Sequence, residues 1–282
     1  MLSRVAVLGL LLCTGGAAAQ APAPPRRVAS MNLSADEILV EILPLERLVS
    51  VTRWADSDSG NITGRVPASV FRIQKADLEQ LVALRPELVV VSEYTDADFL
   101  KQLERTGLRY HRIEGLATLP GIRKAILDLG RAVGEPAAAE RVAKAFDAKL
   151  ADVAKRLGGV KQPRVLYWSS GMTAGADTAI GSLIECSGAR NVGRELGITG
   201  IAPPGGERAF VADPDAILVG TWPRAVESVK EEPLLGKTRA VREGRIVVLP
   251  TSLLVALSQF SADACVELAA RLHPDRVPAK RP

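Results

Sequence analysis

The sequence predicts an α/β protein of two lobes, each with a mainly parallel central sheet, joined by one long helix. From Arg27 onward, short apolar runs alternate with amphipathic segments, which is typical of parallel βαβ units. The alternation stops at residues 136–157, where one helical pattern runs unbroken, and then resumes. A single doubly wound sheet does not need such a helix, so we predict an N-terminal lobe (27–135), a connecting helix (136–157) and a C-terminal lobe (158–282).

The helices and strands of the N-terminal lobe are predicted from the spacing of apolar residues and from capping residues. Ser34 and Glu37 have the spacing of a capping box, which predicts a helix running to about Leu43. The segment at 70–76 is interpreted as a loop. Strands are expected at 27–30, 48–52, 87–92 and 109–113, and further helices at 77–84, 96–105 and 119–133.

The connecting helix keeps one apolar face. Val142, Phe146, Leu150, Val153 and Leu157 follow one another in steps of three or four residues. At 1.5 Å per residue the helix is ~33 Å long, about the width of a lobe. In the C-terminal lobe we expect strands at 164–169, 216–220 and 245–249 and helices at 177–187 and 261–272.

The N-terminus indicates export. A positive start is followed by an apolar run at residues 5–12 and by small residues ending at Ala19, which predicts a secretory signal peptide over 1–19. The run is shorter than the ~20 residues of a membrane span. Cys13 follows two leucines rather than the small residues of a lipid-attachment site. After cleavage, 20–26 is a flexible leader rich in proline and alanine.

The charge distribution argues against nucleic acid as a partner. The net charge is +4, which becomes +3 without Arg4, and the pI is about 9.1. Lysine and arginine are scattered along the chain, whereas a nucleic-acid surface needs them concentrated on one face.

Two cysteines remain after cleavage, Cys186 and Cys265. In an oxidising compartment, paired thiols usually form a disulfide. Two buried free thiols are the alternative, because free cysteine packs like a small apolar residue.

Three segments resemble one known family. Residues 77–91, Asp-Leu-Glu-Gln-Leu-Val-Ala-Leu-Arg-Pro-Glu-Leu-Val-Val-Val, are similar to the helix, "L-x-P-D-L-V" and strand signature of class III periplasmic binding proteins of ABC importers, with Glu87 in place of the aspartate. Residues 207–219 repeat the motif in the second lobe, and 240–249 match the family's last βαβ turn. The resemblance covers 27–272, and the family includes binders of cobalamin, haemin and ferric siderophores.

The resemblance implies a role as well as a fold. Members hold a small-molecule ligand between two lobes joined by a rigid helix and deliver it to a permease dimer in the membrane. The chain is most similar to cobalamin-binding members, which implies a Cys186–Cys265 disulfide. It also implies that Glu79 and Glu207 dock into arginine pockets of the permease, although lone surface glutamates are more often simply solvated. We therefore expect a monomeric periplasmic protein without a cofactor, carrying a corrinoid or a ferric chelate.

Four aromatic residues follow predicted strands in a chain with only 4% aromatic residues. Trp54, Tyr94, Trp168 and Trp222 are candidate ligand contacts, because planar rings stack on a corrin, a porphyrin or a catecholate. The alternative is that each packs beneath its own lobe. Trp54 aligns with a ligand-contacting tyrosine of the cobalamin-binding members.

The sequence departs from the family in the 70–76 loop. Ile73 stands where cobalamin-binding members have a cleft tryptophan, and Arg72 stands near the position of the metal-ligating tyrosine of haemin binders. Arg72 is a candidate contact for an anionic chelate, with ordinary solvent exposure as its alternative. The choice among cobalamin, a ferric siderophore and haemin stays open.

Other classes of function lack the residues they need. A bare-metal site needs several histidine and carboxylate ligands, and the chain has only His111, expected within a strand, and His273. The glycine-rich segment 171–175 lacks the Gly-Lys-Ser/Thr of a phosphate loop, and Ser169 and Ser170 lack the G-x-S-x-G motif. We therefore do not expect an enzyme. An exported sensor that serves a receptor remains the alternative.

Overall fold

The N-terminal lobe is built on a five-stranded parallel sheet in the order β3-β2-β1-β4-β5. The computed structural model describes residues 23–74 and 77–278. Because the strands are parallel, all of their carboxyl ends lie at one edge of the sheet. The strands are β1 (Val28–Ser30), β2 (Leu48–Thr52), β3 (Phe71–Ile73), β4 (Leu88–Ser92) and β5 (Tyr110–Ile113).

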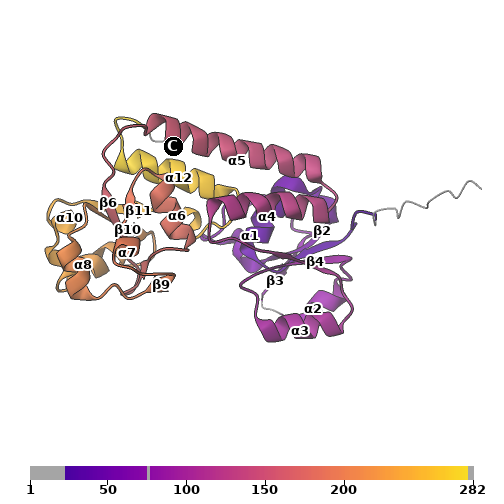
Figure 1. The fold of residues 1–282 in the computed structure, drawn as a ribbon. Helices are drawn as coiled ribbons and strands as arrows, with labels where there is room; N and C mark the ends of the chain where they lie inside the picture. Colours follow the sequence, from indigo (N-terminus) through magenta and orange to yellow (C-terminus); the bar gives the residue numbers. More distant parts are fainter. Residues whose placement is uncertain (1–22, 75–76, 279–282) are drawn as a thin grey trace, which may run out of the picture.

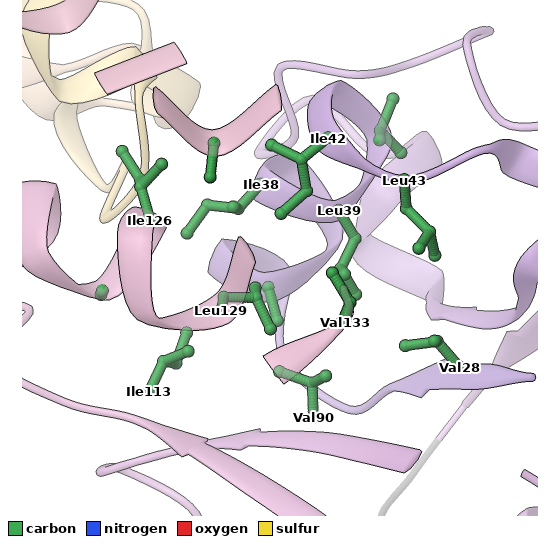
Figure 2. Close-up of a cluster of buried hydrophobic side chains, with 14 of the residues drawn as sticks. Val28, Ile38, Leu39, Ile42, Leu43, Val90, Ile113, Ile126, Leu129 and Val133 are labelled. Carbon is green, nitrogen blue, oxygen red and sulfur yellow. The ribbon is translucent and has the colours of Figure 1, made fainter. Parts of the chain in front are cut away.

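Helices cover both faces of this sheet (Figure 1). One face packs against α1 (Leu33–Ile42) and α4 (Leu119–Ala132), and the other against α2 (Leu78–Ala83) and α3 (Ala97–Arg105). Successive residues of a strand point to opposite faces. Accordingly, Val90 joins the core under α1 and α4, while Val89 and Val91 join the core under α2 and α3. Figure 2 shows the first core, where Ile38 and Leu39 of α1 lie near Leu129 of α4.

The long helix α5 (Pro136–Arg156) runs across both lobes, with α12 (Phe260–Leu272) beside it (Figure 1). Its first half contributes Ala139 and Phe146 to the N-terminal core, and its last turns contribute Val153 to the C-terminal core. A 2.6 Å ion pair from Lys149 to Asp263 links α5 to α12. The predicted helix is therefore present and belongs to both cores.

The C-terminal lobe has a four-stranded parallel sheet in the order β11-β10-β6-β8 and a small antiparallel pair, β7 and β9. Its strands are β6 (Arg164–Tyr167), β7 (Thr173–Ala174), β8 (Arg190–Asn191), β9 (Ile201–Ala202), β10 (Ala216–Gly220) and β11 (Ile246–Leu249). Its helices are α6 (Ala179–Cys186), α7 (Val192–Glu195), α8 (Gly206–Ala212), α9 (Ala225–Glu231), α10 (Arg239–Arg242) and α11 (Thr251–Leu254). Single 3₁₀ turns are η1 (Leu45–Arg47), η2 (Arg53–Asp56) and η3 (Leu235–Lys237).

The disulfide predicted between Cys186 and Cys265 is confirmed. It joins the end of α6 to the middle of α12, with 6.0 Å between the two Cα atoms. Both helices pack on the same side of the C-terminal sheet, so the bridge fixes α12 to this lobe. The fold class of two α/β lobes with parallel sheets is likewise confirmed.

Two local predictions in the N-terminal lobe were wrong. The capping box is absent: Asn32 caps α1 by accepting hydrogen bonds from the backbone N–H groups of Ser34 and Ala35, and Glu37 points elsewhere. The 70–76 loop contains strand β3, which pairs with β2 through Phe71 to Ile73. This three-residue strand buries only Ile73, so it leaves no alternating pattern in the sequence.

Candidate functional site

A pocket of about 280 Å³ opens at the carboxyl edge of the N-terminal sheet. This is where the strand order reverses around β1 and β4, and parallel α/β sheets bind ligands at such a switch point. The lining residues come from the ends of four strands and the segments that follow them: Met31, Asn32, Leu33, Thr52, Trp54, Ile73, Gln74, Thr95 and Phe99.

Trp54 is the largest side chain of this lining and lies in η2, directly after β2. Its side chain is 47% exposed, which is unusual for an indole. The guanidinium of Arg53 lies 4.3 Å from the centre of its ring, so a cation already covers part of one face. The remaining surface is available to a flat ligand.

The described lining combines apolar and uncharged polar groups. Leu33, Ile73 and Phe99 supply apolar surface, while Asn32 and Gln74 supply side-chain amides, of which the Asn32 oxygen is already used to cap α1. Among the described residues that line the pocket, none carries a charge. This chemistry suits a large ligand with an apolar body and uncharged hydrogen-bonding groups.

Two adjacent carboxylates, Asp36 and Glu37, are buried in the first turns of α1 behind this pocket. Asp36 accepts hydrogen bonds from the backbone N–H (3.0 Å) and hydroxyl (2.5 Å) of Thr52, a lining residue. Burial raises the pKa of Asp36 to about 7, against the opposing effect of these donors. Burial also raises the pKa of Glu37.

Sequence reasoning missed both carboxylates as buried groups. The available signal was the composition of α1, where Asp36 and Glu37 stand side by side in a helix whose other residues are mostly apolar. A helix that is apolar on most sides is largely buried, and acids in its first turns are then buried with it, whereas Glu41 near its end is exposed.

Two of the predicted ligand contacts in the N-terminal lobe lie near the pocket without lining it. Tyr94 follows β4 at the same edge of the sheet and is 60% exposed, but the lining is formed by its neighbour Thr95. Arg72 directs its guanidinium into its own loop, donating to Asp56 and to the carbonyls of Val66, Pro67 and Val70. These bonds occupy all five of its N–H donors, so Arg72 holds the loop rather than offering a cation to the pocket.

The two predicted contacts in the C-terminal lobe pack against its core clusters, Trp168 as a buried and Trp222 as a partly buried side chain. Trp168 is only 7% exposed and lies in a core cluster with Leu166, because the two residues share one face of the extended chain. Trp222 packs against the cores on both sides of the sheet. Its ring lies against the backbone of Gly220, where a Cβ would come within 2.2 Å of it. The pocket is therefore made of N-terminal residues.

Glu79 and Glu207 occupy equivalent places in the two lobes. Each lies exposed in the first turn of a short helix, α2 or α8, that leads into a fully buried strand, β4 or β10. Both helices lie on the side of the molecule away from α5 (Figure 1).

The described part of the chain contains neither a cluster of metal-ligating side chains nor a membrane-spanning helix. No group of three or more histidine, cysteine, aspartate or glutamate side chains is placed to hold a metal ion. No helix among the described residues is long and apolar enough to cross a membrane.

Comparison with known proteins identifies the fold and its relatives. A cobalamin-binding protein of Halobacterium salinarum is 24% identical over 237 residues, which are 81% of this chain and 64% of that protein's length. A periplasmic heme-binding protein of Pseudomonas aeruginosa is 26% identical, with a TM-score of 0.75 and coverage of 89% and 94% of the two chains. The periplasmic heme-binding protein of Roseiflexus sp. RS-1 is 24% identical, with a TM-score of 0.74 and coverage of 88% of this chain and 98% of that chain.

These relatives are binding proteins rather than enzymes. This agrees with the expectation, drawn from the missing catalytic motifs, that the chain is not an enzyme. The profile of the family described as periplasmic binding protein matches residues 28–253, which is most of the chain. Together with the two parallel-sheet lobes, this match shows that the chain belongs to the periplasmic binding protein family.

Proposed function

We propose that this chain is the substrate-binding component of an ABC importer and that its cargo is a corrinoid of the vitamin B12 type. The observation that carries the proposal is the pocket at the carboxyl edge of the N-terminal sheet, where the exposed indole of Trp54 stands among uncharged polar and apolar groups. A corrin ring presents a broad apolar face for the indole and a periphery of amides for Asn32 and Gln74.

The lining favours a corrinoid over haem. Haem iron requires an axial ligand from the protein, commonly tyrosine or histidine, and its propionates favour a cationic partner. The described lining contains neither tyrosine nor histidine, and the cation beside it, Arg53, is stacked on the ring of Trp54. A corrinoid brings axial ligands of its own and carries amides in place of most carboxylates. The cobalamin-binding relative supports the same choice, while the heme-binding structures make haem the second candidate.

Membership of this family implies a periplasmic or extracellular location. The finer proposal is export to the periplasm after cleavage near Ala19, which lies outside the described residues. The protein then acts as a monomer and presents Glu79 and Glu207, one on each lobe, to the two subunits of a permease. A carboxylate on each lobe fixes the orientation of docking, since arginine and carboxylate pair in a defined geometry.

The ligand is tested by titrating the purified chain from Gln20 with cyanocobalamin, haemin and a ferric siderophore. Calorimetry or equilibrium dialysis measures binding, because Trp54→Ala also removes a fluorophore. We expect the wild-type protein to bind cyanocobalamin at one site. In Trp54→Ala we expect an affinity at least about ten-fold weaker, because the variant loses one good stacking contact.

Phe71→Ala is the matched control, since Phe71 is an exposed aromatic of the same lobe that does not line the pocket. If haemin or the siderophore saturates the protein instead, the proposed role in transport stands and the proposed cargo is wrong. Absence of binding to all three ligands leaves the receptor-serving sensor as the better account.

Docking is tested separately, by measuring uptake in cells that carry the cognate permease. The variant Glu79→Arg/Glu207→Arg replaces attraction to arginine pockets by repulsion, so uptake falls to background while ligand affinity stays at the wild-type value. Glu104→Arg, an exposed change on α3, is the control and leaves uptake unchanged. Normal uptake by the double variant contradicts the docking role.

A further inference from the structure

The two lobes touch through a polar junction centred on the buried Glu37 of α1. This side chain belongs to the N-terminal lobe and is 1% exposed. Its Oε1 accepts hydrogen bonds from the backbone N–H (3.0 Å) and the side-chain amide (2.7 Å) of Asn61. Its Oε2 accepts a 2.5 Å hydrogen bond from the hydroxyl of Ser258, which lies 221 residues away between α11 and α12.

Two more hydrogen bonds cross between the lobes at the same place. The amide of Gln259 donates to the backbone carbonyl of Glu37 at 2.8 Å, and the amide of Asn61 donates to the carbonyl of Ser252 in α11 at 3.0 Å. Glu37 thus joins α1, the segment around Asn61 and the chain between α11 and α12.

The junction continues directly to the pocket. Asn61 ends a tight turn that folds back on Trp54, whose carbonyl accepts hydrogen bonds from the backbone N–H (3.1 Å) and hydroxyl (2.8 Å) of Ser57. Gly60 then passes so close that a Cβ there would lie 2.6 Å from the same carbonyl. The position of Trp54 is therefore tied to Asn61, and through Glu37 to the C-terminal lobe.

A buried carboxylate is a costly way to fill space. An apolar side chain of similar size packs without the desolvation penalty, and this penalty is what raises the pKa of Glu37. Its oxygens instead accept three hydrogen bonds of defined direction, two from one lobe and one from the other. Such a group fixes the relative positions of its partners more effectively than it stabilises the fold.

We propose that Glu37 is the positioning residue that sets the Trp54 turn and the angle between the two lobes together. α5 and α12 connect the lobes on one side, and α4 also meets α6, where the hydroxyl of Ser182 donates to the carbonyl of Ala117 at 3.2 Å. The Glu37 junction adds a further constraint on rotation, and it is the one that reaches the Trp54 turn. The part of the proposal that concerns ligand affinity rests on the proposed function, whereas the part that concerns lobe geometry does not.

The geometry is tested in the ligand-free protein by distance measurements between spin labels. The labels are placed at Gln102 on α3 and Lys230 on α9, which are exposed positions in the two lobes. We expect a narrow distance distribution in the wild-type protein and a broadened or displaced one in Glu37→Ala. Asn61→Ala, which removes the crossing bond to Ser252 while leaving the buried carboxylate in place, changes the distribution in the same direction and guards against misfolding of the first variant.

Glu41→Ala is the matched control. Glu41 lies one turn further along α1 and pairs with Arg65 at 2.6 Å on the surface of the same lobe, so its loss leaves the distribution unchanged. Distributions in Glu37→Ala and Asn61→Ala that equal the wild-type one overturn the proposal, because α5, α12 and the contact between α4 and α6 then suffice to fix the lobes.

The effect on the pocket is tested with cyanocobalamin as the probe. We expect affinity about ten-fold weaker in Asn61→Ala, the effect of losing about 1.4 kcal/mol of preorganisation. A changed distance distribution with unchanged affinity confines the role of Glu37 to lobe geometry and overturns its link to Trp54. Failure of the wild-type protein to bind cyanocobalamin bears on the proposed cargo alone, since the distance measurement needs no ligand.

Discussion

The two lobes place aromatic side chains at corresponding strand ends and use them in opposite ways. In the N-terminal lobe, Trp54 and Tyr94 follow β2 and β4 and stay exposed. In the C-terminal lobe, Trp168 and Trp222 follow β6 and β10 and pack into the core. Both lobes have a fully buried strand preceded by a short helix with an exposed glutamate, so the frames are alike.

The difference arises from the local backbone. η2 turns the chain away from β2, which carries Trp54 out of the sheet, whereas the chain at Trp168 stays extended and hydrogen-bonds to the carbonyl of Leu218. The ring of Trp168 therefore falls on the same side of the sheet as Leu166, within one of the two core clusters. The N-terminal lobe thus presents these rings to solvent, whereas the C-terminal lobe holds its rings in a rigid packed core.

Removal of the disulfide tests that rigidity and is expected to have the largest effect on stability. The bridge closes a loop with a sequence separation of 79 residues, so the Cys186→Ser/Cys265→Ser variant loses about 4 kcal/mol by the chain-entropy estimate. Denaturant unfolding measures the loss. Ligand affinity is expected to survive, because the pocket belongs to the other lobe. A loss of less than about 1 kcal/mol contradicts the role of the bridge as the main constraint on α12.

A matched pair of tryptophan variants sharpens the comparison directly. Trp168→Ala leaves a cavity in a packed core and costs about 3 kcal/mol or more of unfolding free energy. Trp54→Ala removes an exposed ring and changes the unfolding free energy by only about 0.5 kcal/mol. Circular dichroism follows both unfolding transitions without relying on tryptophan emission. Equal losses of unfolding free energy in the two variants would contradict the distinction between an exposed ring in the N-terminal lobe and a packed ring in the C-terminal lobe.

The most gradual expected effect is a pH dependence of stability from the carboxylate behind the pocket. Because the pKa of Asp36 is about 7 in the folded chain and about 4 in the unfolded chain, the folded state binds its proton more tightly. The contribution is full below about pH 4 and is lost as the pH rises through about 7, at about 1 kcal/mol per pH unit.

Asp36→Asn removes this part of the slope when unfolding is measured at several pH values. The raised pKa of Glu37 leaves a residual slope of the same sign. Asp98→Asn, an exposed change in the first turn of α3, serves as the control. An unchanged slope in Asp36→Asn shows that the carboxylate is ionised across this range.

Local sequence determined most of the elements and the fold class. Apolar patterns and capping residues locate β2, β4, α3, α4 and α5 within a residue or two, because the strands are mostly apolar, almost fully buried runs and the helices bury a regular stripe of side chains. The resemblance of residues 77–91 to a known signature pointed to the family that the comparison then showed. The cysteine pair pointed to a bridge that is present.

Tertiary structure alone decided the composition of the site. β3 has too few buried residues to leave a pattern, and its place beside β2 brings Ile73 and Gln74 into the pocket. The sequence suggests that Arg72 is a free cation, but the carboxylate of Asp56, 16 residues away, and nearby loop carbonyls accept hydrogen bonds from all of its donors. Glu37 reads as a helix cap, yet its hydrogen-bond partner Ser258 lies 221 residues away. Sequence patterns record which face of an element is buried, whereas the partner of a polar side chain depends on which elements the fold brings together.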